Sequence, residues 1–310
     1  MTDARRTWRL QLAVGLLGVA ATLLALVVAL SAVSLHVGSP QALARACGSF
    51  VLPQVTIASA IVLALGSLAF AVLLLAARSA LRQLRASRRA LAGLRTVRPA
   101  PVGPPRTLLF ASSAPQAFCT GLWRPRLYLS DATLTVLTAA ELDAVLAHEE
   151  HHLRHRDPLR IFFARMLSDA LFFLPVLRRL SERYAALAEL AADAAAVRRT
   201  NDPTPLASAL VAFEDSMGPA VVGIAPERVD QLLGARPRWE LPLALLAWAA
   251  VVILALVVVA VRTEQATDHA AISLPLVAAQ LCMLTMAVVP VVLGAAVVLG
   301  SRRLLARAKG

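Results

Sequence analysis

The sequence predicts a mainly α-helical membrane protein, in which four transmembrane helices flank a cytoplasmic α+β domain. Two observations support this prediction. The 310-residue chain is 58% hydrophobic with a mean hydropathy of +0.69, which is more apolar than an ordinary soluble protein. The excess lies in four charge-free runs, each long enough to cross roughly 30 Å of hydrocarbon as a helix. These runs are residues 11–35, 55–77, 241–261 and 271–299.

The basic residues predict how these helices are oriented. Arginines precede the first run, follow the second, precede the third and follow the fourth, whereas loops 36–54 and 262–270 carry one arginine each. By the positive-inside rule, both termini and residues 78–240 are cytoplasmic. The net charge of +12 is then mostly charge facing anionic lipid, and nucleic-acid binding is not indicated. The first run is too long for a cleaved signal peptide, and we expect it to remain as an anchor.

Composition divides the chain into successive segments. The sequence "TVRPAPVGPPR" at 96–106 is too rich in proline to be one helix, and short β-like runs follow it at 107–112, 116–120 and 126–130. The three cysteines, Cys47, Cys119 and Cys282, are too dispersed for a disulfide framework or a CxxC metal site. The predicted segments are a membrane hairpin (1–77), a basic Pro-rich linker (78–106), a cytoplasmic domain (107–239), a second hairpin (240–300) and a basic tail (301–310).

The stretch "AVLAHEEHHLRHRD" (144–157) contains four of the six histidines and lies in a predicted helix. Thr138 followed by Glu141 forms a capping-box pattern, so we expect the helix to begin near Ala139. Pro158 requires an end near Arg156, and Asp157-Pro158 suits the N-cap and first position of the next helix. That next helix, 158–174, is apolar but interrupted by charges. We interpret it as a core helix, with shallow bilayer contact as the alternative.

Two histidine pairs on this helix have the spacing of a metal site. His148 with His152, and His151 with His155, each lie one turn apart, so either pair can hold one ion. Glu149 distinguishes them, because His-Glu-x-x-His places a carboxylate beside the open metal position, where it can take a proton from bound water. The second pair lacks this base. The alternative is a solvated, charged helix face without a metal.

A catalytic zinc needs a third protein ligand and keeps a fourth position for water. No histidine lies between His155 and His269, so a glutamate on a later helix is expected. Glu189 fits, because apolar segments flank it, and Asp193 one turn later is placed to hydrogen-bond the outer nitrogen of a ligand histidine. Weaker rivals for the third ligand are Glu182 and Asp169.

The run "GLWRPRLYLSDATLTVLTAAELDAVLAHEEHHLRHRDPL" (121–159), followed by "ELAAD" (189–193), resembles the BlaR/MecR-type integral-membrane zinc metallopeptidases of the glutamate-ligand zincin group. The resemblance covers roughly residues 105–235 and implies a zincin-like cytoplasmic domain with one Zn²⁺ per chain. It implies His148, His152 and Glu189 as zinc ligands, Glu149 as the catalytic base and Asp193 as a hydrogen-bond partner behind the ligands. Asp157 also matches, although we favour its N-cap role.

HtpX-like membrane peptidases are the nearest alternative. In them an edge segment similar to "PQAFCTG" (115–121) lines the cleft, where an extended substrate pairs by strand addition. They also place membrane segments between the two ligand helices, whereas residues 153–188 are too short and too charged for two spans, which favours the BlaR type. BlaR/MecR sensors carry a penicillin-binding domain after the last span. This chain stops at Gly310 without Ser-x-x-Lys, so β-lactam sensing is not implied.

The expected function is therefore a zinc endopeptidase in a bacterial cytoplasmic membrane, hydrolysing cytosolic or membrane-proximal proteins. Family analogy suggests a transcriptional repressor as substrate. The expected partners are a protein or peptide and the bilayer, without nucleic acid or a small-molecule cofactor; no oligomeric state is indicated. Candidate oxyanion donors are Tyr184, Arg154 and Arg156. A catalytically silent membrane sensor or scaffold is the second hypothesis. A transporter is disfavoured, because the four apolar runs contain no acidic residue or histidine.

Overall fold

The computed structural model describes residues 2–34, 57–217, 226–232, 241–266 and 272–273. Within them, three helices are long and apolar enough to cross a membrane: α1 (Thr2–Ser31), α3 (Ile57–Ala92) and α10 (Leu243–Ala266). They coincide with the first three predicted runs. Of the fourth predicted run, 271–299, only Ile272 and Ser273 are among the described residues, and the basic tail lies outside them. Helix α3 continues as far as Ala92, so the first part of the predicted linker extends the second apolar helix.

The chain forms two compact units, residues 1–20 with 71–254, and residues 21–70 with 255–310. In the second unit, the far half of α1 packs against the first half of α3 and the end of α10. This core consists largely of small residues, which allow close approach between apolar helices: Ala25, Val28, Ala29, Ala32, Val62, Leu65 and Ala260. Strand β1 (Val33–Ser34) pairs in parallel with β6 (Ile272–Ser273) in the same unit.

The first unit contains a four-stranded mixed sheet in the order β2-β3-β5-β4. The strands are β2 (Arg95–Pro99), β3 (Thr107–Ala111), β4 (Ala117–Thr120) and β5 (Arg126–Ser130). Strands β3 and β5 are parallel, and the other two pairings are antiparallel. The three β-like runs predicted from sequence are confirmed. Strand β2 was predicted as linker because of its proline, and as an edge strand it tolerates Pro99.

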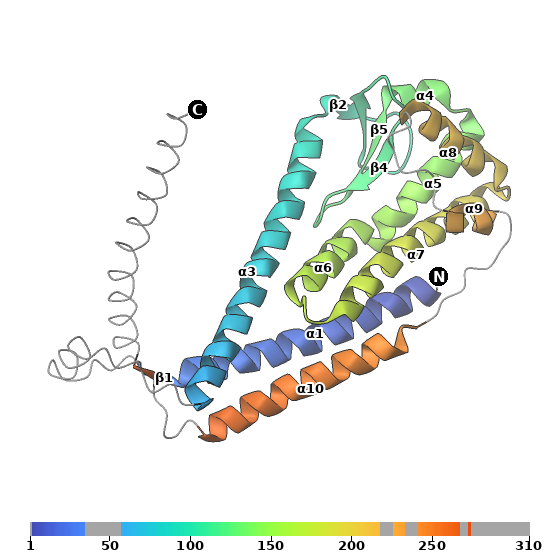
Figure 1. Cartoon of the computed structure of the whole chain (residues 1–310). Helices are drawn as coiled ribbons and strands as arrows, with labels where there is room; N and C mark the ends of the chain where they lie inside the picture. Colours follow the sequence, from blue (N-terminus) through green and yellow to red (C-terminus); the bar gives the residue numbers. More distant parts are fainter. Residues whose placement is uncertain (1, 35–56, 218–225, 233–240, 267–271, 274–310) are drawn as a thin grey trace, which may run out of the picture. The chain divides into compact units, whose positions relative to one another are not determined.

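Helices cover this sheet, and α5 (Ala139–His155) is central among them (Figure 1). One side of α5 packs on the sheet, where Leu146 contacts Leu109, Leu127 and Leu129. Its other side carries Ala144 and Ala147 against α7 and α8, so the helices approach closely. The remaining helices of the domain are α4 (Asp131–Val136), α6 (Asp157–Ala170), α7 (Pro175–Thr200), α8 (Thr204–Met217) and α9 (Pro226–Leu232).

Both predicted ends of α5 are confirmed. The Thr138 amide donates to Glu141 Oε2 at 2.8 Å and the Thr138 hydroxyl accepts from the Glu141 amide, which completes the capping box. The helix ends at Arg156, whose left-handed backbone (φ 52°, ψ 40°) joins α5 directly to α6. The N-cap of α6 is therefore Arg156, and the prediction that Asp157 caps this helix is wrong. The sharp turn at Arg156 leaves the Asp157 carboxylate free to turn back toward α5.

Candidate metal centre

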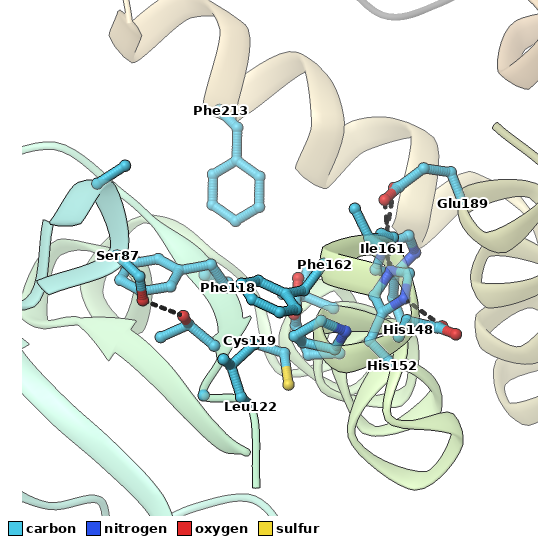
Figure 2. A pocket seen from close by; sticks show the side chains of 18 of the residues that line it. Ser87, Phe118, Cys119, Leu122, His148, His152, Ile161, Phe162, Glu189 and Phe213 are labelled. Carbon is cyan, nitrogen blue, oxygen red and sulfur yellow. Dashed lines mark hydrogen bonds and ion pairs between the residues drawn. The ribbon is translucent and has the colours of Figure 1, made fainter. Parts of the chain in front are cut away.

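Three of the predicted residues come together at the contact between α5 and α7 (Figure 2). The Nε2 atoms of His148 and His152 are 3.2 Å apart. Glu189, from α7, places Oε2 3.4 Å from His148 Nε2 and Oε1 3.6 Å from His152 Nε2. The two rings are buried and Glu189 is half-buried. These three side chains therefore offer ligand atoms to a single point in space.

Each ring is held from behind by its own carboxylate. His152 Nδ1 lies 2.9 Å from Asp157 Oδ2, and His148 Nδ1 lies 2.9 Å from Asp193 Oδ1, although this second contact is too bent for a regular hydrogen bond. A proton on each Nδ1 serves these carboxylates and leaves both Nε2 atoms as bare lone pairs. Two bare lone pairs facing each other at 3.2 Å would repel, so this position needs a positive charge between the rings, either a proton or a metal cation.

The ligand spacing fits a tetrahedral ion. With metal–nitrogen bonds of about 2.0–2.1 Å, adjacent ligand atoms of a tetrahedral zinc are about 3.3–3.4 Å apart. The three measured separations are 3.2, 3.4 and 3.6 Å. The 3.4 and 3.6 Å separations involve different oxygens of the Glu189 carboxylate, and each is close to the edge length of such a tetrahedron. Three protein ligands on one ion would leave a fourth corner for another ligand. His148, His152 and Glu189 are thus a group of side chains that could hold a metal ion.

The charges of the cluster also suit a cation. Burial alone would lower the pKa of His148, but its contacts with Asp193 and Glu189 outweigh burial and raise the pKa to about 9. Burial would raise the pKa of Glu189 and Asp193; contact with His148 outweighs it, and both pKa values fall below the usual range. The carboxylates are therefore charged and favour a positive centre at the histidines.

Glu149 lies beside this cluster and lines the same cavity. Burial raises the pKa of Glu149 above its usual range, against the lowering effect of His148 and His152. A carboxylate with a raised pKa in the same cavity as the histidines can accept and return a proton. Cys119 also lines the cavity, but burial, followed by the charges of Glu149 and Asp157, raises the pKa of its thiol to about 12. Cys119 is thus protonated at neutral pH and unsuited to act as a nucleophile.

Arg228, which was not predicted, and Tyr184, which was predicted only as an oxyanion donor, complete the surroundings. Arg228, on α9, donates from Nε and Nη2 to the two oxygens of Asp193 at 2.7 and 2.6 Å, and its Nη1 lies 3.6 Å from Glu189. Tyr184 donates its hydroxyl to Asp157 Oδ1 at 2.7 Å. No motif in the sequence marks Arg228, since a bidentate contact with a carboxylate on a distant helix has no local signature.

The remaining candidates lie elsewhere. The rivals for the third ligand, Glu182 and Asp169, pair instead with Arg178 and Arg82. Of the three candidate oxyanion donors, Tyr184 is committed to Asp157, and neither it nor Arg154 nor Arg156 lines the cavity. Arg228 does line it, and is the nearest described guanidinium to Glu189.

The cavity has a volume of about 640 Å³ and extends from His148, His152 and Glu189 over strand β4 (Figure 2). All four β4 residues line it, and within the described part of the chain β4 is an edge strand whose one neighbour is β5. Three phenylalanines add apolar surface, and α3 contributes polar groups. These residues are Phe118, Phe162, Phe213, Gln83 and Ser87. The cavity thus combines an unpaired strand edge with apolar side chains, the features that bind an extended peptide.

A His-Glu-x-x-His helix with a glutamate from a second helix, in a chain with long apolar helices, defines the class of membrane metallopeptidases. The chain belongs to the BlaR1 peptidase M56 family, whose sequence model matches residues 19–211. It is also similar to two proteins named "Protease HtpX homolog". The one from Acaryochloris marina (strain MBIC 11017) is 40% identical over 23% of this chain and 25% of the relative. The one from Acidiphilium cryptum (strain JF-5) is 30% identical over 36% of this chain and 50% of the relative. The chain thus spans a quarter to a half of these relatives.

Proposed function

We propose that this chain is a zinc-dependent endopeptidase of the bacterial cytoplasmic membrane. The zinc ligands are His148, His152 and Glu189, and Glu149 is the catalytic base. The observation that carries the proposal is that the two histidine Nε2 atoms lie 3.2 Å apart and the Glu189 carboxylate oxygens approach them to 3.4 and 3.6 Å, separations close to the edge length of a tetrahedral zinc site. Asp193 and Asp157 orient the ligand rings from behind.

When bound, zinc supplies Lewis-acid polarisation of the peptide carbonyl and acidifies water. Glu149 takes a proton from the attacking water and then donates it to the leaving amine. Burial raises the pKa of Glu149 and so makes its carboxylate a stronger base than an exposed glutamate, which suits the step in which it takes the proton. Burial also keeps the proton from solvent until it is donated to the amine. Arg228 balances the negative charge of Asp193 and Glu189, so that Glu189 remains a ligand while Glu149 gains and loses its proton.

The substrate in this proposal is an extended segment of a protein that pairs with the free edge of β4. The edge supplies backbone donors and acceptors, and Phe118, Phe162 and Phe213 contact the apolar side chains of the substrate. We place β3, β4, β5 and α4–α9 in a cytoplasmic domain of residues 107–239, to whose sheet β2 (Arg95–Pro99) adds an edge strand, with a fourth span at 271–299. A cytosolic or membrane-proximal protein is the substrate class; a transcriptional repressor follows from family analogy alone. The second candidate is an HtpX-like membrane-protein quality-control protease: the similarity to the two HtpX homologues supports an HtpX-like protease, and the quality-control role follows from family analogy alone.

The proposal is tested by hydrolysis of fluorescently labelled casein by the purified full chain in proteoliposomes. Hydrolysis should stop with 1,10-phenanthroline and return with added Zn²⁺. The Glu149→Gln variant keeps the size and buried position of the side chain but not the base, so cleavage should fall by about 10²–10⁴-fold while bound zinc is unchanged. Equal cleavage by zinc-loaded wild type and Glu149→Gln would mean that the hydrolysis does not come from this site. That result, or no cleavage by either protein, would favour the silent sensor or scaffold.

A further inference from the structure

The first half of α1 runs alongside α6 in matching register, within one compact unit. Gln11 Nε2 donates to the Ala164 carbonyl at 3.0 Å. One turn later along α1, a Cβ at Gly15 would meet Leu167 Cδ1 at 2.8 Å, and a Cβ at Gly18 would meet Leu171 Cδ1 at 2.9 Å. The two glycines therefore permit close contact, and α6 advances in the same direction as α1.

Helix α7 returns along the same part of α1 in the opposite direction. The rings of Trp8 and Tyr184 lie 5.4 Å apart, and Gly18 is as close to Leu174 as to Leu171. Ten residues separate the two contacts on each helix, a rise of about 15 Å. The turn between α6 and α7, which we call the α6–α7 turn (Leu171–Leu174), is therefore level with Gly18 of α1 (Figure 1).

Two observations indicate that the α6–α7 turn lies at the depth of the membrane. On α1, Arg9 is the last charged residue before the apolar run, and Gly18 lies about 13 Å further along the helix. On α3, Asp169 accepts from Ser79 Oγ at 2.6 Å and from Arg82 Nη2 at 2.9 Å, where the basic part of α3 begins. Because α6 advances beyond Asp169 toward the apolar part of α1, the α6–α7 turn lies on the membrane side of this charged layer.

The surface of the turn fits this location. Leu171 and Leu174 are buried against α1, but Phe172 points outward with 57% of its surface exposed. An exposed phenylalanine at the tip of a turn is unfavourable in water and favourable in acyl chains. Arg178 and Arg179 follow within two turns on α7 and are exposed, so their guanidinium groups can reach lipid headgroups.

We propose that the α6–α7 turn is immersed in the cytoplasmic leaflet and that Phe172 contacts lipid. The catalytic domain is then seated on the bilayer by this turn as well as tethered by its spans. Helix α6 also lines the cavity through Ile161, Phe162 and Arg165, within about three turns of Phe172. The cavity consequently opens close to the membrane surface, and it takes polypeptide segments that lie near the bilayer. The depth of the turn does not depend on the proposed peptidase activity.

The test is the solvent accessibility of single spin labels on the full chain in phosphatidylcholine–phosphatidylglycerol vesicles. The background replaces Cys47, Cys119 and Cys282 by serine. The test variant is Phe172→Cys. Leu16→Cys, on the exposed face of α1 (62%), is the lipid reference, and Val136→Cys, at the end of α4 (52%), is the water reference. Helix α4 lies at the opposite end of the domain from the α6–α7 turn (Figure 1).

A label at residue 172 should resemble that at Leu16, with high collision rates for oxygen and low rates for nickel–EDDA. A label at Arg178→Cys should be intermediate, because it lies nearer the headgroups. Similar nickel accessibility at residues 172 and 136 would overturn the proposal. Because the measurement needs neither metal nor hydrolysis, that result would leave the proposed peptidase intact. Conversely, a protein without peptidase activity but with a lipid-exposed residue 172 would contradict the proposed function and support the immersed turn.

Discussion

Helix α5 presents two histidine pairs with the same spacing and different surroundings. In the first pair, the rings of His148 and His152 meet nearly edge-on, at an interplanar angle of 74°, with both Nε2 atoms pointing to a common position. In the second, the rings of His151 and His155 are stacked, with centroids 4.0 Å apart, and His155 Nδ1 contacts the His151 carbonyl. Spacing along a helix therefore brings two rings together without deciding what they bind.

The difference comes from residues on other elements. Asp157 and Asp193 hold the Nδ1 atoms of the first pair, and Glu189 faces its Nε2 atoms. Among the described residues, no carboxylate oxygen lies within ion-pair distance of the second pair. Burial, followed by His155, lowers the pKa of His151 to about 4, whereas the pKa of His148 is raised to about 9. A metal site on a helix is thus specified by the helices that pack against it.

The largest effect should come from deleting a ring from each pair in turn. His148→Ala or His152→Ala should reduce bound zinc from about one per chain to nearly none, because two ligands cannot close the site. His151→Ala should leave zinc binding unchanged, and it is a matched control on the same helix. The measurement is elemental analysis of detergent-purified protein. Equal zinc loss in His151→Ala and His148→Ala would mean that the two pairs do not differ as the geometry indicates.

The sequence predicts the features that one or two adjacent helical turns determine. The capping box of α5 and its end at Arg156 follow from spacing, because each depends on a regular helix. Glu189 was predicted from its apolar flanks and the family resemblance, because its approach to the histidines depends on how α7 packs on α5. The position of Asp157 does not follow, since it depends on the left-handed conformation of Arg156, a residue for which this conformation is uncommon.

Long-range contacts account for the other differences. Arg228 reaches Asp193 across 35 positions of sequence, and only the packing of α9 on α7 brings them together. Likewise, the register of α6 and α7 on α1 depends on Gln11, Gly15 and Gly18, which in the sequence look like ordinary members of an apolar run. Periodicity identifies such a helix but not its partners.

Removing one carboxylate behind the first pair should weaken metal binding without abolishing it. Asp157→Asn and Asp193→Asn should each lower zinc affinity by about 10–100-fold, because the ring loses the acceptor that fixes its tautomer and orientation. Asp143→Asn is the matched control, since Asp143 lies on α5 and pairs with Arg199 instead. The measurement is competition with a chromophoric chelator. An affinity in Asp157→Asn equal to that of Asp143→Asn would show that this support is unimportant.

The raised pKa of His148 gives a pH dependence. Zinc binds the neutral ring, so the proton that metal-free His148 holds with a pKa of about 9 must leave first. Below pH 9, apparent zinc affinity should therefore fall by about tenfold for each pH unit, and it should rise again as the pH is raised. Chelator competition between pH 6.5 and 8.5 measures this slope. A flat profile would contradict a proton held at His148 in the metal-free protein.

The smallest effect should come from the next layer of support. Tyr184→Phe removes the hydroxyl that donates to Asp157 and keeps the ring that contacts Trp8. A net hydrogen bond contributes about 1 kcal/mol, so zinc affinity should fall by about fivefold or less. If the hydroxyl acts through Asp157, Tyr184→Phe should cause little further loss in an Asp157→Asn background. Fully additive losses would mean that Tyr184 supports the domain independently of His152, and that the first pair is set apart by its carboxylates alone.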